Sequence, residues 1–570
     1  MTNSIKEIEH NDVLFIIGSN ATEAHPIIGN KMKRAAQNGA KLIVADPRRT
    51  ELVEHSHMWL RLKPGTDNAL IDGIINTIIS NGWHDEEYIA ERCEGFDDLW
   101  QTVKDFTADD AAAITGVPAA DIRAAAELYA TTRKAAIYYT LGITEHTVGT
   151  ANVMNLANLA MITGHIGMEF AGINPLRGQN NVQGSCDVGA LPNSYPGYPS
   201  VLDEATQAKF SAAYGVTMPT QMGLKIPEMF DAAVAGSLKA MYIMGEDPAL
   251  TDADANHVRK ALGSLDFLVA QNLFMTETAK YADVFLPSSC YAEKDGTFTN
   301  TERRVQRVRK AVEPPGQARA DWEIILDLSA RLGHPMPFTS PEEVFEEMRT
   351  LIPQYAGITY ERLGTTGLQW PCPTEDHPGT QFLHEGKFTR GKGLLQGIPY
   401  VDPAEVTDEE YPILLTTGRM LYHYNIMTRN CENLEWLRPH ELAEISPADA
   451  ERLGLREGEM VQVTSRRGSV STRVTVTDRV PAGTMFMTLH YKESPVNELT
   501  NSAADPVTKT AEFKVCAVRV DKRPQPAEQA APAERVAAIV ETGCGCSPVQ
   551  TTDCGCAPVS AGGCGCSPGN

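Results

Sequence analysis

The chain has 570 residues, too many for one hydrophobic core, so its length predicts two to four domains. Its 73 acidic and 50 basic side chains give a formal net charge of −23, which disfavours nucleic acid or an anionic membrane as the main partner but leaves room for a small anionic substrate held by local arginines. It has no run of roughly eighteen apolar residues and no secretory pattern at its start, so we expect a cytoplasmic protein without direct membrane insertion.

Short apolar runs predict a parallel β-sheet in the first part of the chain. Residues 13–17 and 41–45 are two such runs, and the helical stretch between them completes a strand–helix–strand unit. The same patterns continue with helices at 69–81, 119–132 and 151–163 and a strand at 135–141. These elements predict an α/β domain of the doubly wound kind.

A polar stretch at 174–198 separates this set from a second one. It is rich in Gly, Asn, Pro and Gln, and a long loop of this composition inside a compact protein is usually functional. Strands predicted at 240–244, 267–270 and 284–287 then indicate a second α/β domain.

The character of the chain changes to β-rich from residue 412. Strands predicted at 413–417, 460–465, 469–476 and 484–489 are mostly separated by turn residues, which favours a barrel. After about residue 522 the composition shifts to Pro, Ala and Gln and then to Gly, Cys, Ser and Pro, which predicts a disordered tail.

The twelve cysteines fall into two groups. Six are scattered without metal-ligand spacing and are expected to be small buried hydrophobes: Cys93, Cys186, Cys290, Cys372, Cys431 and Cys516. The other six form three CGC units at a ten-residue period in the tail. Thiolates at this density can bind soft metals, whereas the spacing does not match a zinc or ferredoxin motif, so a metal role and a plain low-complexity tail both stay open.

Glycine and polar residues follow the predicted strands at the edge where open α/β sheets bind ligands. They are Gly18, Asn20 and Asp46 in the first set and Asp247, Gln271 and Asn272 in the second. Two such halves suit a ligand with two nucleotide ends, although each position alone also fits an ordinary turn. No GxGxxG follows the first strand, so the nicotinamide-binding fingerprint is absent.

Arg177 stands in the polar stretch, flanked by glycine and amide side chains. A guanidinium in this setting can present its planar donors to a carboxylate or phosphate, and it also fits a solvated surface arginine. Three other short stretches, 302–304, Arg419 with His423, and Asn497, could hold phosphate or polar ring edges, and each also fits a salt bridge or surface group.

Several segments together resemble a known family. The segment RGQNNVQGSCD at 177–187 looks like the active-site loop of molybdenum formate dehydrogenases. Segments 242–248, 282–287, 293–304 and 418–419 resemble the wider superfamily of bis-molybdopterin guanine dinucleotide oxidoreductases, and the resemblance runs from about residue 5 to about residue 520. It implies an α/β fold with two doubly wound cofactor-binding domains and a C-terminal β-barrel.

The resemblance also implies an activity: oxidation of formate to carbon dioxide at a molybdenum or tungsten bis-pterin cofactor. The cofactor carries the hard chemistry and the protein positions the substrate. Electrons would pass to an electron-transfer subunit such as an iron–sulfur protein, a hydrogenase or an NAD-linked module.

Roles for single residues come from the same resemblance. Arg177 would hold the formate carboxylate, and Gln179 would lie near the pterin. Gly18 and Asn20 belong to the expected cofactor site. Dinucleotide contacts are expected at Asp46, Asp67, Asp247, Gln271, Asn272, Ser288 and Asp321, and further pterin contacts at Arg419, His423, Asn497 and Lys514. Glu145 departs from the glutamine that similar enzymes can carry, and a carboxylate beside phosphates is unfavourable.

A larger departure concerns the start of the chain. Members of the family begin with a cysteine-ligated 4Fe–4S domain, followed by a Cys or selenocysteine that ligates molybdenum and by a His. None of these precedes the first strand here, so we expect Met1 to be an internal methionine and the 570-residue chain alone not to oxidise formate.

With the family in view, the expected domains can be given bounds. They are an α/β cofactor-binding domain at 1–178, a second one at 179–291, the remainder of the cluster-side domain with its connections at 292–405, a barrel at 406–522 and the tail at 523–570. Another molybdopterin oxidoreductase and a non-catalytic cofactor-binding fragment remain as alternatives to formate oxidation.

Overall fold

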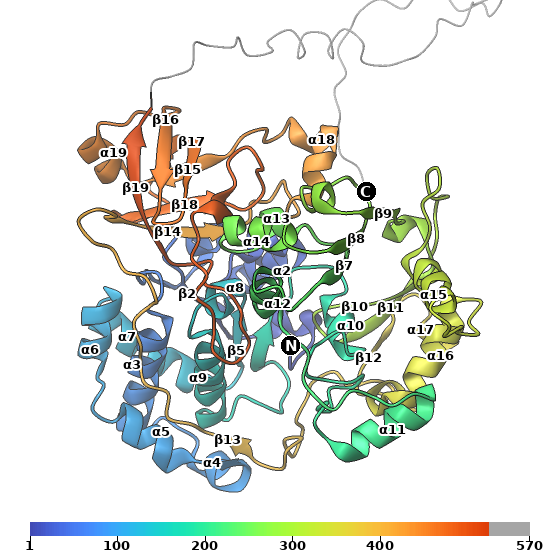
Figure 1. Ribbon diagram of the computed structural model, residues 1–570. Helices are drawn as coiled ribbons and strands as arrows, with labels where there is room; N and C mark the ends of the chain where they lie inside the picture. Colours follow the sequence, from blue (N-terminus) through green and yellow to red (C-terminus); the bar gives the residue numbers. More distant parts are fainter. Residues whose placement is uncertain (524–570) are drawn as a thin grey trace, which may run out of the picture. The chain divides into compact units, whose positions relative to one another are not determined.

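The computed structural model describes residues 1–523, and its first part is built on a five-stranded parallel sheet (Figure 1). The strand order is β3-β2-β1-β5-β6. The strands are β1 (Val13–Ile17), β2 (Lys41–Ala45), β3 (Met58–Leu60), β5 (Ala135–Tyr139) and β6 (Gly172–Pro175). The order reverses between β1 and β5, and an open α/β sheet binds its ligand beyond the carboxyl ends of the strands at such a point.

Both faces of this sheet are buried, which explains why its strands are continuous apolar runs. In β1, Val13, Phe15 and Ile17 pack on one side against α3, α7 and α9, while Leu14 and Ile16 pack on the other side against α2. The helices of this part are α1 (Ala21–Ala24), α2 (Pro26–Gln37), α3 (Asp67–Ser80), α4 (Glu86–Arg92), α5 (Phe96–Val103), α6 (Ala108–Thr115), α7 (Ala119–Ala130), α8 (Leu141–Thr144) and α9 (Gly149–Ile162).

A second parallel sheet has the order β7-β8-β9, from β7 (Ala240–Met244), β8 (Phe267–Asn272) and β9 (Val284–Pro287). Helices α12 (Ile226–Val234) and α14 (Ala255–Leu262) pack on one face around Leu268. On the other face Tyr242, Met244 and Phe267 are exposed within residues 1–523.

An antiparallel sheet with its own small core follows. Its strands are β10 (Gly296–Thr299), β11 (Arg304–Val308) and β12 (Leu368–Gln369). The remaining helices before the barrel are α10 (Val182–Asp187), α11 (Glu204–Tyr214), α13 (Pro248–Thr251), α15 (Asp321–Arg331), α16 (Pro341–Leu351) and α17 (Tyr360–Leu363). Two further short strands, β4 (Cys93–Glu94) and β13 (Gly393–Leu394), pair with each other. They connect the chain that follows the antiparallel sheet to the first part of the molecule.

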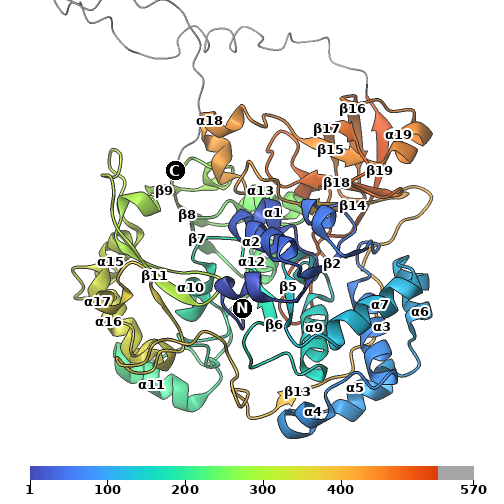
Figure 2. The same cartoon turned by 180° about the vertical axis from the view of Figure 1, so that it is seen from behind.

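The last described part is a closed six-stranded barrel, which Figure 2 shows from the opposite side to Figure 1. Its order is β14-β18-β15-β17-β16-β19. The strands are β14 (Ile413–Gly418), β15 (Leu442–Ile445), β16 (Met460–Thr464), β17 (Ser469–Val476), β18 (Thr484–Thr488) and β19 (Cys516–Lys522), with the helices α18 (Glu432–Glu435) and α19 (Pro447–Leu453) between them. Alternate residues of the strands, such as Val461 and Val463, fill the interior.

The predicted α/β class with parallel sheets and a C-terminal barrel is confirmed. Three details differ from the sequence-based expectation. The strand expected at 135–141 ends at Tyr139, and the polar stretch begins inside β6 and contains α10. Among the scattered cysteines, Cys431 is exposed and Cys186 and Cys290 are only half-buried, rather than buried. Among the strands of the barrel, β15 and β19 were not predicted. The domain boundaries stay predictions, and the tail with its CGC units lies outside the described residues. No helix of residues 1–523 is long and apolar enough to span a membrane.

Candidate functional site: a cavity at the strand ends of the first sheet

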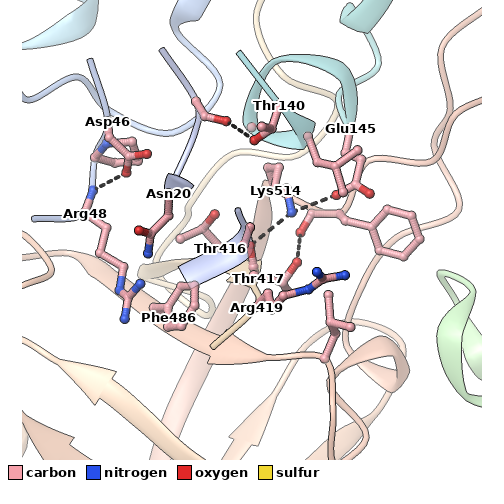
Figure 3. A pocket seen from close by; sticks show the side chains of 18 of the residues that line it. Asn20, Asp46, Arg48, Thr140, Glu145, Thr416, Thr417, Arg419, Phe486 and Lys514 are labelled. Atoms are coloured by element: carbon pink, nitrogen blue, oxygen red, sulfur yellow. Dashed lines mark hydrogen bonds and ion pairs between the residues drawn. The ribbon is translucent and has the colours of Figure 1, made fainter. Parts of the chain in front are cut away.

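A cavity of about 260 Å³ lies where the carboxyl ends of β1, β2 and β5 meet the barrel (Figure 3). The sheet contributes the loops after these three strands, including Asp46 and Thr140. The barrel contributes the end of β14, Phe486 of β18 and Lys514 before β19. The cavity therefore occupies the position that the reversal of strand order predicts.

Two glycines allow the loops after β1 and β5 to touch. Gly18 has φ +54°, and a Cβ added to it would lie 2.7 Å from the carbonyl carbon of Gly142. The Gly142 N–H donates to Gly18 O at 3.1 Å. This contact leaves backbone, rather than side chains, at the floor of the cavity, so that a ligand can approach the chain closely.

Carboxylates that are buried or half-buried line the sheet side of the cavity. Asp46 accepts a hydrogen bond from the Arg48 backbone N–H at 2.9 Å, and burial raises the pKa of its carboxyl to about 7. Asp67 opens α3, and burial raises its pKa too. Burial alone would lower the pKa of His146, but Glu512 and Asp67 together raise it. These acceptors suit ligand groups that carry several N–H or O–H donors.

Cations line the barrel side of the same cavity. Lys514 Nζ lies 2.7 Å from Glu145 Oε2 and donates to Thr417 O at 3.1 Å. Arg419 Nη2 donates to Asn425 Oδ1 at 2.6 Å, and burial lowers the pKa of its guanidinium. Figure 3 shows both cations among the pocket side chains. Such groups suit phosphate oxygens.

Several polar atoms of the wall have no hydrogen-bond partner among residues 1–523. They are Asn20 Nδ2, Glu23 Oε2, His25 Nδ1, Thr50 Oγ1 and His146 Nδ1. Buried polar groups are nearly always satisfied, so these atoms indicate a place for a polar ligand. Together with the acceptors of the sheet and the cations of the barrel, they fit the nucleotide and phosphate parts of a pterin dinucleotide.

A second cluster of predicted residues lies at the carboxyl ends of β7, β8 and β9. It consists of Asp247, Gln271, Asn272, Ser288 and Asp321. The Asp247 carboxylate accepts from the Thr278 backbone N–H at 2.7 Å, and Gln271 Nε2 donates to Asp321 Oδ1 at 2.6 Å. Lys294 also bonds to Asp321. The two α/β halves thus repeat the same placement of polar groups at strand ends.

One residue connects the two clusters. Asn497, next to the barrel, is 2% exposed and donates to Leu250 O at 3.1 Å and to Thr251 O at 2.8 Å. Both acceptors belong to α13, which follows Asp247, and Thr251 also lines the cavity.

Arg177 lies beside the cavity but does not line it. Its neighbours Leu176, Gly178 and Gln179 do. Its carbonyl accepts from His25 Nε2 at 2.8 Å, and its guanidinium lies over α10, where Nε donates to Gln183 Oε1 at 3.0 Å. No hydrogen bond within residues 1–523 uses Nη2, which leaves one donor group for an anion.

The structure therefore sorts the predicted site residues into four places, one of which is the second cluster at the ends of β7, β8 and β9. Those that line the cavity are Gly18, Asn20, Asp46, Asp67, Gln179, Arg419, Asn497 and Lys514. Arg177 is next to the cavity. His423 is outside it, 1% exposed, and its ring nitrogens contact Thr428 Oγ1 and Arg438 O within its own loop.

Other residues depart from the sequence-based expectation or were missed by it. Arg303, one of three side chains at 302–304 considered for phosphate binding, is 1% exposed and donates to five backbone carbonyls, including Met1 O, so it is not available to a ligand. Missed residues include Lys63 and His146, which line the cavity. No motif marks either of them in the sequence.

Comparisons with known proteins place the chain in a family. A family model described as "Molybdopterin oxidoreductase" matches residues 1–331, and one described as "Molydopterin dinucleotide binding domain" matches residues 413–517. The chain is 49% identical to F420-dependent formate dehydrogenase 2 subunit alpha of Methanococcus maripaludis, over 92% of this chain and 78% of that protein.

Two further proteins extend this comparison. The chain is 42% identical to formate dehydrogenase H of Escherichia coli, over 91% of this chain and 74% of that protein. The structure of acetylene hydratase from Pelobacter acetylenicus superimposes with a TM-score of 0.73 at 24% identity, covering 91% of this chain and 79% of the other, which supports the fold alone. The chain therefore belongs to the molybdopterin oxidoreductase family, within its group of formate dehydrogenase alpha subunits.

Proposed function

We propose that this chain holds a bis-molybdopterin guanine dinucleotide with molybdenum or tungsten and, as part of the complete enzyme, oxidises formate to carbon dioxide, passing electrons to a partner subunit. The observation that carries the proposal is the Arg177 guanidinium, fixed at Nε beside the wall of the cavity with Nη2 unused by residues 1–523. A guanidinium with a free edge binds a small carboxylate by charge-assisted hydrogen bonds.

The two strand-end clusters would hold the two dinucleotides. In the cavity, Asp46 offers a carboxylate to the N–H groups of a guanine, while Lys514 and Arg419 offer positive charge to phosphates. Gln271 and Asp321 would serve the second dinucleotide at β8 and α15. His423 is expected to act by supporting its own loop.

When bound, the metal centre supplies the two-electron oxidation, and the residues of this chain bind and orient formate beside it. Residues 1–523 contain no group of three or more His, Cys, Asp and Glu side chains that could hold a metal ion. A Cys or selenocysteine ligand and a 4Fe–4S cluster belong to the same proposal, as parts of the complete enzyme.

A second candidate is a different molybdopterin oxidoreductase. The geometry that favours it is the same free guanidinium edge, because nitrate is also a small planar oxyanion. The RGQNNVQG loop, together with relatives named as formate dehydrogenases, favours formate.

The test uses the cofactor-loaded protein expressed from its complete coding region. We expect formate to reduce a dye acceptor and nitrate not to reoxidise it, and we expect Arg177→Lys to raise the KM for formate by about tenfold or more, since a lysine has no planar guanidinium that Gln183 can hold beside the cavity. Turnover of nitrate but not of formate would favour the second candidate. Turnover of neither by a metal-loaded protein would contradict both.

A further inference from the structure

The carboxylate of Asp187 is the centre of a buried hydrogen-bond network beside Arg177. Asp187 ends α10 and is 1% exposed. Its Oδ1 accepts from Gln183 Nε2 at 2.8 Å and from the Tyr198 hydroxyl. Its Oδ2 accepts from the Tyr355 hydroxyl at 2.6 Å and from Trp370 Nε1 at 2.8 Å. Four donors thus converge on one side chain.

Only an acceptor-only side chain matches these four donors. The indole N–H of Trp370 can only donate. Burial and the nearby Asp187 charge raise the pKa of Tyr198 and of Tyr355 well above the usual value, so both hydroxyls keep their protons and donate. An asparagine at 187 would turn an NH2 group toward one pair of donors and leave them unsatisfied.

The network fixes which amide atom of Gln183 faces Arg177. The Gln183 NH2 group donates to Asp187 and to the Tyr198 hydroxyl, so its carbonyl oxygen is turned toward Arg177, 3.0 Å from Nε. A flipped amide would put an NH2 group against the Nε–H of Arg177 and a carbonyl against a carboxylate. Both contacts are unfavourable, so Asp187 selects the orientation that holds the guanidinium.

The local backbone keeps this arrangement compact. Gly184 lies inside α10 between the two side chains, and a Cβ there would be 2.2 Å from Asn181 Oδ1. Asn181 Oδ1 accepts from the Thr299 backbone N–H at 2.9 Å, which ties the start of α10 to β10. Tyr355 and Trp370 belong to the part of the chain that contains the antiparallel sheet of β10, β11 and β12. The network therefore anchors the loop that carries Arg177 to a separate hydrophobic core.

We propose that Asp187 and Gln183 are positioning residues that set the orientation of the Arg177 guanidinium for an anionic substrate. Nε is held by Gln183 and Nη1 lies 3.5 Å from Cys186 Sγ, so Nη2 is the donor that this arrangement leaves for the anion. The identity of that anion as formate rests on the proposed function. The positioning itself rests on the contacts alone.

The test compares Gln183→Met and Asp187→Asn with Gln207→Met. Gln207 is a control with the same side chain, whose Nε2 donates a hydrogen bond to Val201 O at 2.7 Å, away from Arg177. In the cofactor-loaded enzyme we expect the KM for formate to rise about tenfold in both network variants, the factor for one charge-assisted hydrogen bond, and to stay unchanged in the control. The double variant should be no worse than either single variant, because both act through one contact.

A second measurement does not depend on formate. The rate at which phenylglyoxal modifies Arg177, followed by mass spectrometry of its peptide, should change in both network variants and stay at the wild-type value in the control. If wild-type protein fails to turn over formate while these rates change, the proposed function fails and the positioning role stands. If the rates in Gln183→Met and Asp187→Asn equal that of the control while the variants remain folded by circular dichroism, the positioning role is overturned.

Discussion

Replacing Asp46 by asparagine should stabilise the cofactor-free protein at neutral and alkaline pH. Burial raises the pKa of this carboxyl from 3.8 to about 7, so the folded state resists its ionisation while the unfolded state does not. The sign follows from linkage: a raised folded pKa gives stability that is present below about pH 4 and lost as the pH rises through 7. Asparagine keeps the acceptor for the Arg48 N–H and carries no charge.

The magnitude follows from the same numbers. The difference between the two pKa values corresponds to a loss of about 4 kcal/mol in the free energy of unfolding at pH 8. Asp46 is only half-buried and faces a cavity that water can enter, so screening reduces the expected gain to about 2 kcal/mol. For a chain of this size that gain raises the melting temperature by about 2 °C, provided that it unfolds cooperatively.

The assay is calorimetric unfolding of cofactor-free protein between pH 4 and pH 8. The control is Asp12→Asn, an exposed aspartate just before β1. We expect Asp46→Asn to melt above wild type at pH 8, with the difference vanishing near pH 4, and the control to show no such trend. A variant that melts below wild type at pH 8, or a difference independent of pH, would refute the desolvation argument.

The remaining predictions concern the same cavity. Gly18→Ala should destabilise the protein by about 1–3 kcal/mol in denaturant unfolding, because its Cβ would overlap Gly142 at a positive φ; an unchanged midpoint would contradict this. Glu145→Gln should increase cofactor retention in gel filtration with metal analysis, since Lys514 loses its carboxylate partner and is free for phosphate; reduced retention would count against the phosphate role. Arg48→Met should cost about 1–3 kcal/mol in denaturant unfolding, because the buried Glu444 carboxylate loses its hydrogen bonds from Arg48 and keeps only Arg479; a neutral effect would show that water reaches that carboxylate.

The sequence was sufficient for the parts of the site that depend on local patterns. Gly18 and Asp46 could be predicted because each directly follows an apolar run, and the end of a parallel strand has a known position in an α/β sheet. The RGQNNVQG motif singled out Arg177 in the same way.

Other parts depend on partners far apart in the chain. His146 lies between Asp67 and Glu512, and nothing in the sequence around His146 indicates that either carboxylate is close to it. Asp187 accepts a hydrogen bond from Trp370 only because the chain around β12 folds back on α10. Strand β19 was missed because residues 516–522 end in charged side chains, yet the strand closes the barrel between β14 and β16. Tertiary pairing, rather than local pattern, decides these positions.

The most direct test of the account is metal and nucleotide analysis of the purified protein from its complete coding region. The account predicts molybdenum or tungsten with two guanine nucleotides released by acid for each metal, and loss of both when Asp46 and Lys514 are replaced together by alanine. A folded, formate-oxidising protein that contained neither metal nor guanine nucleotide would contradict it.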